Sequence, residues 1–173
     1  MMKENKMKTY VIILSKTFPK SHPLSGQETG FGSAFKSSQK IHTVRGNYPM
    51  WKKRFEEVQK GTAVLSVREW TGTPYRSPQR ELRKLTSEDL IGVQKVVFTR
   101  SQWEYEDEDH FCYWANIDGF EIDFEELAKN DGFSDFTDFV SWIDPSLDSQ
   151  TPDDDGWVSQ EMAIIHFTKF RYE

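Results

Sequence analysis

Residues 40–46 concentrate side chains that can bind an anion. They read Lys-Ile-His-Thr-Val-Arg-Gly. In an extended chain successive side chains alternate between faces, so Thr43 and Arg45 project from one face and His42 from the other, as a packing or surface residue. Lys40 falls one position short of that alternation, so a turn just before it must bring its long stem round. An ammonium, a hydroxyl and a guanidinium gathered in this way suit a phosphate, a carboxylate or a polarised carbonyl. The competing interpretation is an exposed strand with solvated charges.

The same residues are compatible with binding and with catalysis. Lys40 can act as a base or nucleophile only when neutral, which needs burial or a neighbouring cation such as Arg45. Thr43 can donate a hydrogen bond to a base edge, attack an acyl carbon with Lys40 as base, or serve only as a β-branched strand residue. Spacing alone leaves these alternatives open.

Strands separated by short helices must position this segment. Continuous or alternating apolar runs predict strands, and apolar residues at helical spacing predict helices. The expected strands cover residues 10–15, 63–70, 79–85, 92–102, 111–117 and 162–170. The expected helices cover residues 33–38, 48–60 and 123–128, with a fourth that is capped by Ser134 and ends before Pro145. Because βαβ alternation is absent, this order predicts an α+β fold around a curled sheet or small barrel.

The composition favours a single aromatic-rich domain with a local basic patch. The chain has 173 residues, of which 36% are hydrophobic and 14% aromatic. Its net charge of −6 argues against a protein that coats long nucleic acids by bulk electrostatics. Acids gather at residues 104–109, which we expect to form a solvated loop, and at residues 153–155. Residues 36–54 instead carry six basic side chains and no acid, which suits a small anionic ligand or a short nucleic-acid segment.

Cysteine and histidine usage gives no sign of a disulfide or a metal site. Cys112 is the single cysteine, which fits a reducing compartment. The four histidines lack metal-ligand spacing, and we read His166, within an apolar strand, as a core histidine. The apolar run at residues 10–14 is too short for a signal peptide or a membrane span. We therefore expect a cytoplasmic protein with no metal and no cofactor.

Three segments together resemble the ASCH family of the PUA-like superfamily. Residues 39–45 resemble the family signature Gly-x-Lys-x-x-Thr-x-Arg, with Ser38 in place of the glycine. Residues 61–68 are similar to the strand that follows in the family. Residues 127–133 resemble its Ala-x-x-(Glu/Asp)-Gly-Phe element, which leads through a helix to a final aromatic strand.

The resemblance covers residues 36–70 and 118–170. It implies a PUA-like small mixed β-barrel with short flanking helices. We therefore expect one domain over residues 1–173, with a family-specific insertion at about residues 71–117.

The resemblance also implies a cleft beside the Lys-Thr-Arg segment that binds RNA or nucleotides. Some bacterial members of the family are amidohydrolases that remove an acyl group from modified cytidine with a Lys, a Thr and a Glu. Carried over by position, these residues are Lys40, Thr43 and Asp131, although Asp is one methylene shorter than Glu and reaches less far. We expect an RNA- or nucleotide-binding protein. The alternatives are deacylation of a nucleoside such as acetylated cytidine, cleavage of single-stranded RNA, and a partner-binding role through the acidic face.

In the binding hypothesis, Lys40 and Arg45 hold phosphate while Thr43 and Asp131, on the opposite side, read the base edge. Asp131 also has a structural interpretation as a helix-end residue, followed by Gly132 with a positive φ. Further phosphate or stacking contacts are expected from the second strand and the loop after it: Arg68, Tyr75 and Arg76.

Overall fold

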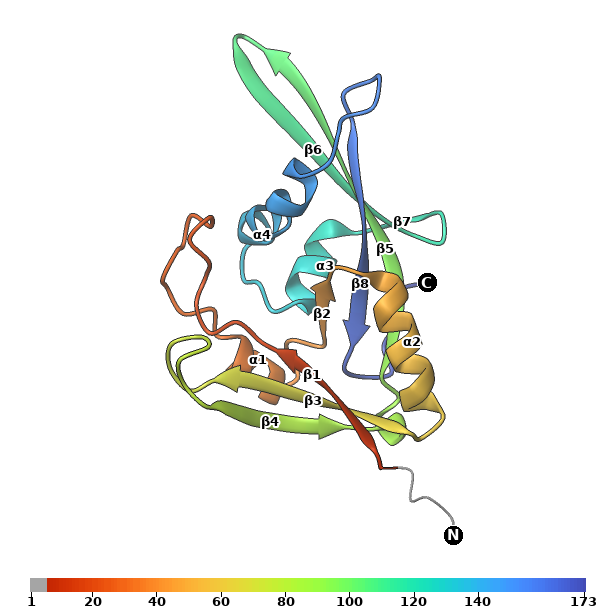
Figure 1. The fold of residues 1–173 in the computed structure, drawn as a ribbon. Helices are drawn as coiled ribbons and strands as arrows, with labels where there is room; N and C mark the ends of the chain where they lie inside the picture. The colour runs from red at the N-terminus through yellow and green to blue at the C-terminus, as the bar shows by residue number, and fades with distance from the viewer. Residues whose placement is uncertain (1–5) are drawn as a thin grey trace.

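The computed structural model describes residues 6–173, which form two β-sheets flanked by α-helices (Figure 1). The strands are β1 (Lys8–Ile13), β2 (His42–Arg45), β3 (Ala63–Trp70), β4 (Gln79–Leu85), β5 (Gly92–Tyr105), β6 (Glu108–Ile117), β7 (Phe120–Ile122) and β8 (Val158–His166). The helices are α1 (Phe31–Lys36), α2 (Tyr48–Gln59), α3 (Phe124–Asn130) and α4 (Phe136–Asp148), with a 3₁₀ turn at Ser87–Asp89.

The two sheets confirm an α+β fold but do not close into a barrel, so the expected barrel is wrong. One sheet has the order β1-β3-β4, with β1 parallel to β3, and the other has the antiparallel order β2-β8-β5-β6-β7. At the seam between the sheets, Arg45 of β2 donates from Nη2 to the carbonyl of Ile13 in β1 at 2.7 Å. A side-chain hydrogen bond thus links β1 and β2, whereas a closed barrel would pair these strands by backbone hydrogen bonds. The cause is the short β2, because Asn47 adopts a left-handed conformation (φ 61°) and turns the chain into α2.

Aromatic side chains fill the core where α3 and α4 pack on the larger sheet. Phe139 of α4 is fully buried, and its ring lies 5.2 to 6.2 Å from those of Phe133, Phe124 and Phe98. Each of these rings removes a large apolar area from water. Aromatic residues therefore compensate for the low hydrophobic fraction, as the composition indicates.

Helix α4 differs from its expected bounds at both ends. Its N-cap is Asp135, whose carboxylate accepts a hydrogen bond from the backbone N–H of Thr137 at 2.8 Å, and not Ser134. The helix continues through Pro145, although proline lacks the N–H that would bond to the preceding turn. Burial of Leu147 in the last turn favours this continuation. None of the helices in residues 6–173 is both long enough and apolar enough to cross a membrane.

The acidic run at residues 104–109 belongs to a hairpin and is not a loop. β5 and β6 are paired up to Tyr105 and Glu108, and only Glu106 and Asp107 form the turn. Both turn residues have a positive φ, as a type I′ hairpin turn requires. The expected bounds of β3 and β4 are confirmed and α2 ends one residue early, whereas the other elements shift at one or both ends by up to four residues. In particular, β8 ends at His166, opposite the first residues of its antiparallel neighbours β2 and β5.

Candidate functional site

Lys40 and Asp131 meet directly in the structure, although 91 positions separate them in the sequence. Lys40 Nζ donates to the carboxylate Oδ1 of Asp131 at 2.6 Å and to its carbonyl oxygen at 2.5 Å. The chain turns at Ser38, whose φ of 63° is the conformation that favours the glycine of the family signature. Asp131 follows the last turn of α3 as its C-cap. The end of α1 and the end of α3 therefore position the pair.

This ion pair is buried, whereas the sequence led us to expect the two side chains to face each other across solvent. Only 1% of Lys40 and 4% of Asp131 is exposed. The ammonium also lies 4.4 Å from the ring centroid of Phe31, an arrangement that favours a cation. The ammonium of Lys40 thus contacts only Asp131 and Phe31 among the groups described above, and in this conformation it is not available to bind a phosphate.

Burial and neighbouring charges both shift the pKa values of Lys40 and Asp131. Burial prevails at Lys40, and the neighbouring charges prevail at Asp131. Burial lowers the pKa of Lys40, the carboxylate of Asp131 offsets only part of this effect, and the guanidinium of Arg45 lowers this pKa further. Burial alone would raise the pKa of Asp131, but Lys40 and His42 outweigh it and hold that pKa below its ordinary value. Asp131 is therefore ionised at neutral pH, and the Lys40 ammonium gives up its proton more readily than a solvated lysine.

His42 completes this cluster, although alternation had indicated only a packing or surface role. It is fully buried, and its Nδ1 lies 3.3 Å from Oδ2 of Asp131. This contact is too loosely aligned for a good hydrogen bond, and within residues 6–173 neither atom has another partner. On its other side, Nε2 lies 2.7 Å from the hydroxyl of Tyr172, which accepts from Asn130 at 3.0 Å. Since a carboxylate only accepts, the consistent tautomer carries its proton on Nδ1 and accepts from Tyr172 at Nε2.

Thr43 and Arg45 lie together on the other face of β2. Arg45 donates from Nη1 to Thr43 Oγ1 at 2.7 Å and to the carbonyl of Val44 at 2.9 Å, in addition to its bond with Ile13. Those bonds use three of the five N–H groups of the guanidinium. Thr43 is buried, so Arg45 is the residue of β2 that remains partly accessible. The structure therefore brings together two pairs, Lys40 with Asp131 and Thr43 with Arg45.

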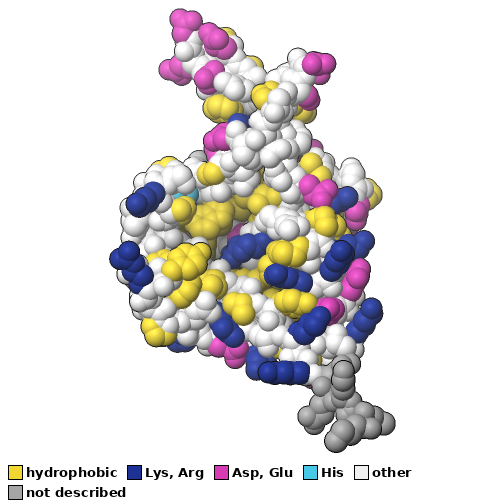
Figure 2. Space-filling model, in the orientation of Figure 1, with side chains coloured by type: hydrophobic (Ala, Val, Ile, Leu, Met, Phe, Trp, Pro, Cys, Tyr) yellow, Lys and Arg dark blue, Asp and Glu magenta, His cyan; other side chains and the backbone are white. Residues whose placement is uncertain are grey.

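The face shown in Figure 2 is hollowed near its centre, over β2 as seen in Figure 1. A Lys or Arg side chain lies at the floor of this hollow, and hydrophobic side chains surround it. Among the residues of β2, Arg45 is the partly accessible one, and two N–H groups of its guanidinium bond to no other described residue.

Of the three outer residues expected to contact a ligand, Arg68 lies in β3 of the smaller sheet, and Tyr75 and Arg76 lie in the loop that joins β3 to β4. Arg68 donates to Ser66 and Gln79 on β3 and β4. Tyr75 is exposed and its ring lies 5.2 Å from that of Trp70, and Arg76 is also exposed. Within residues 6–173, none of the three bonds to Lys40, Thr43, Arg45 or Asp131 through its side chain.

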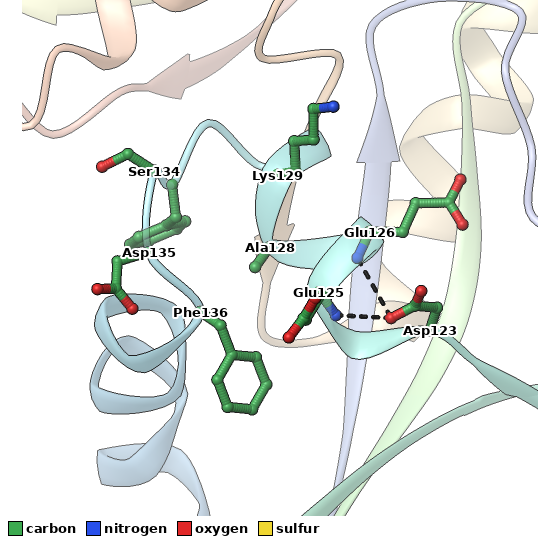
Figure 3. A pocket seen from close by; sticks show the side chains of 9 residues that line it. Asp123, Glu125, Glu126, Ala128, Lys129, Ser134, Asp135 and Phe136 are labelled. Carbon is green, nitrogen blue, oxygen red and sulfur yellow. Dashed lines mark hydrogen bonds between the residues drawn. The ribbon is translucent and has the colours of Figure 1, made fainter.

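A cavity of about 850 Å³ lies apart from the β2 hollow, between α3 and the start of α4 (Figure 3). Asp123, Glu125, Glu126 and Asp135 line it, with Lys129 as the one basic side chain. So many carboxylates would repel a phosphate, and this cavity is a poor nucleotide site. A second cavity of about 600 Å³ borders the backbone on both sides of the ion pair, at Gln39, Ile41, Asn130 and Gly132.

Gly132 lets α3 end against the side chain of Lys40, and we expect Gly132→Ala to be destabilising. Its φ is +92°, and an added Cβ would lie 3.1 to 3.2 Å from the Lys40 stem. Gly119 has a similar φ of +83° with nothing within 4 Å, so Gly119→Ala isolates the cost of the backbone conformation. In urea unfolding, we expect Gly119→Ala to cost about 1 kcal/mol and Gly132→Ala about 1–2 kcal/mol more. Equal costs would show that the contact with Lys40 is not tight.

No family model, curated protein or solved structure matches this chain. Among residues 6–173, no group of three or more His, Cys, Asp or Glu side chains is arranged to hold a metal ion.

Proposed function

We propose that this chain is an ASCH-type, PUA-like protein that binds RNA or a nucleotide in the hollow over β2. The observation that carries the proposal is the contact between Lys40 and Asp131, with Thr43 and Arg45 on the adjoining strand. These are the four positions that the family signature places at its cleft. A cytoplasmic location belongs to the same proposal.

The burial of Lys40 and Asp131 changes the roles that spacing alone suggested for them. Arg45 is the direct phosphate ligand, because two of its N–H groups remain and a guanidinium suits the geometry of a phosphate. The Lys40–Asp131 pair lies beneath and fixes the end of α3 against β2. Arg68, Tyr75 and Arg76 are proposed as outer contacts to a longer RNA, through phosphate pairing and base stacking.

Fluorescence anisotropy with a labelled six-nucleotide RNA and with a labelled mononucleotide tests the proposal. Arg45→Ala should weaken binding about tenfold or more, since a hydrogen bond to a charged group contributes about 1.5–3 kcal/mol. Lys52→Ala is the matched control, because Lys52 is an exposed cation of the same basic segment on α2. Wild-type affinity in folded Arg45→Ala would refute the assignment. Shortening of the RNA during the assay would indicate the nuclease alternative.

One observation favours a second candidate, hydrolysis of an acyl group from a modified nucleoside. Burial lowers the pKa of Lys40, which brings its amine closer to the neutral form that a general base requires. In this reaction, Lys40 would accept the Thr43 proton as the hydroxyl adds to the acyl carbon, and would return it to the cytidine amino nitrogen as the acyl C–N bond breaks. Water would then cleave the acyl ester on Thr43, which releases the acid and restores the hydroxyl. Thr43 Oγ1 accepts from Arg45 and Lys40 is paired with Asp131 in this structure, so the reaction would require both contacts to be released.

Incubation with acetylated cytidine, with chromatography for cytidine and acetate, tests the second candidate. Turnover that is lost in Thr43→Val and retained in Lys52→Ala would support it. Absence of turnover, or turnover that survives in Thr43→Val, would remove it.

A further inference from the structure

A two-stranded arm extends beyond the body of the protein (Figure 1). We define the arm as residues 101–112, the part of the β5–β6 hairpin that no other strand accompanies. β5 pairs with β8 only up to Arg100, and β6 pairs with β7 only from Ala115 onwards. An arm of this kind is not needed to build the core, and its side chains are available to a partner.

One face of the hairpin carries a row of aromatic rings, which we call the aromatic row. Residues that pair directly across two strands share a face, and so do residues two or four positions apart. Thr99 pairs with Trp114, and Trp103 pairs with His110, so both pairs lie on this face. The members of the row are Trp157, Trp114, Trp103, His110 and Tyr105.

The rings of the aromatic row are ordered against one another but remain accessible. Trp114 and Trp157 stack with centroids 5.1 Å apart and planes within 5°. Trp103 stacks on His110 at 5.8 Å. The exposed fractions are 47% for Trp103, 61% for Tyr105 and 43% for Trp157. At the base of the hairpin the opposite face packs on α4, where Arg100 bonds to Asp144 and Asp148. The aromatic row therefore lies on the face that points away from α4.

The arm and the nearby loop at residues 151–157 carry carboxylates and no basic residue. Residues 101–112 contain five Asp or Glu and no Lys or Arg, and residues 151–157 contain three Asp and no Lys or Arg. Figure 2 shows Asp and Glu side chains gathered on the two projections at this end of the molecule, with hydrophobic side chains below them. Aromatic faces attract cations, and carboxylates form strong hydrogen bonds with guanidinium and ammonium groups.

We propose that the aromatic row and the carboxylates beside it form a docking surface for a basic protein segment rich in Arg or Lys. The apolar stems of such side chains lie along the indole rings while their charged heads reach the carboxylates. A nucleic acid would be repelled, because its phosphates carry the same charge as the arm. A second copy of this chain would bring two acidic arms together, which like charges oppose. An uncharged partner would bury the carboxylates without compensation.

Titration of the full chain with a hexa-arginine peptide, followed by calorimetry, tests the proposal. Trp103→Ala combined with Tyr105→Ala should weaken binding about tenfold or more, as removal of central aromatic contacts does in protein interfaces. Asp153→Asn, Asp154→Asn and Asp155→Asn combined should weaken it several-fold, and added salt should weaken it further. The arm variants alter exposed residues only, and circular dichroism checks that the body stays folded.

Two matched controls separate this surface from the general acidity of the chain. Phe120→Ala removes an exposed aromatic residue outside the arm, and Glu125→Gln with Glu126→Gln removes acids of the α3–α4 cavity. Both should leave the affinity for hexa-arginine unchanged. The proposal is overturned if hexa-arginine does not bind, if the arm variants bind it as wild type does, or if the cavity variant loses as much affinity as the arm variant. Self-association that disappears with Trp103→Ala would instead assign the surface to a second copy.

Discussion

Replacement of Lys40 by Met should lower the free energy of unfolding by about 3–5 kcal/mol, because it leaves a buried carboxylate without its charge partner. Asp131 is 4% exposed, and its remaining contacts cannot replace the two hydrogen bonds from the ammonium. Met has a similar length and keeps the apolar packing of the lysine stem. The effect therefore reports the loss of charge and not a cavity. Urea unfolding at pH 7 gives the measurement.

A second variant and a control sharpen this prediction. Adding Asp131→Leu to Lys40→Met should recover much of the loss, because it removes the unpaired charge as well. Lys36→Met, an exposed lysine at the end of α1, should change stability by about 0.5 kcal/mol or less. The cost of Lys40→Met should shrink at pH 4.5, where an Asp131 without its partner takes up a proton. A cost below about 1 kcal/mol at pH 7 would show that the pair is more solvated than its burial indicates.

The elements of the fold were largely predictable because their signals are local. Alternating or continuous apolar runs located all of the longer strands, and the stripe of Trp51, Phe55 and Val58 located α2. The cap of α3 by Asp123 follows from the same kind of evidence, since its carboxylate accepts from the backbone of Glu125. Such features depend on neighbours a few residues away.

The closure of the sheets was not predictable in the same way. Whether β1 and β2 pair depends on two edges that lie far apart in the sequence, and on the length of β2 after the turn at Asn47. A single left-handed residue ends that strand, and Arg45 then makes the connection through its side chain. Nothing in the apolar pattern specifies such a link.

In the candidate site too, contacts between sequence neighbours were predictable and contacts between distant residues were not. Lys40 and His42 are two positions apart, so simple alternation places them on one face, and Asp131 contacts both. The sequence contains that signal, but grouping Lys40 with Thr43 by chemistry hid it. Tyr172, 130 positions beyond His42, had no signal that could have been read. Spacing singled out Lys40, Thr43 and Arg45, and the family resemblance singled out Asp131, but neither indicated how they pair or that Lys40 and Asp131 are buried.

Stability should also fall with pH below 6.5 because of His166, by about 1.4 kcal/mol for each pH unit. Burial first, and then the nearby charges of His42 and Arg171, lower the pKa of His166 from 6.5 to about 2. Its Nε2 bonds to Gln94 at 2.9 Å, while its buried Nδ1 has no partner within residues 6–173. Below pH 6.5 the unfolded chain binds a proton that the folded protein does not, so protonation favours unfolding. The loss continues down to the folded pKa.

Urea unfolding between pH 7.5 and 4.5 measures this effect, which should reach about 2–3 kcal/mol at the acid end. His166→Gln keeps a polar side chain without the titration, so its stability should change less over the same range. His110→Gln, on the arm, should retain the wild-type pH dependence. The titration of Asp131 does not interfere with this measurement. Because its pKa in the folded protein is lowered from 3.8, its effect on the free energy of unfolding appears mainly below about pH 3.8. An unchanged pH dependence in His166→Gln would assign the effect to another group, and a flat wild-type profile would mean that His166 can be protonated within the folded protein.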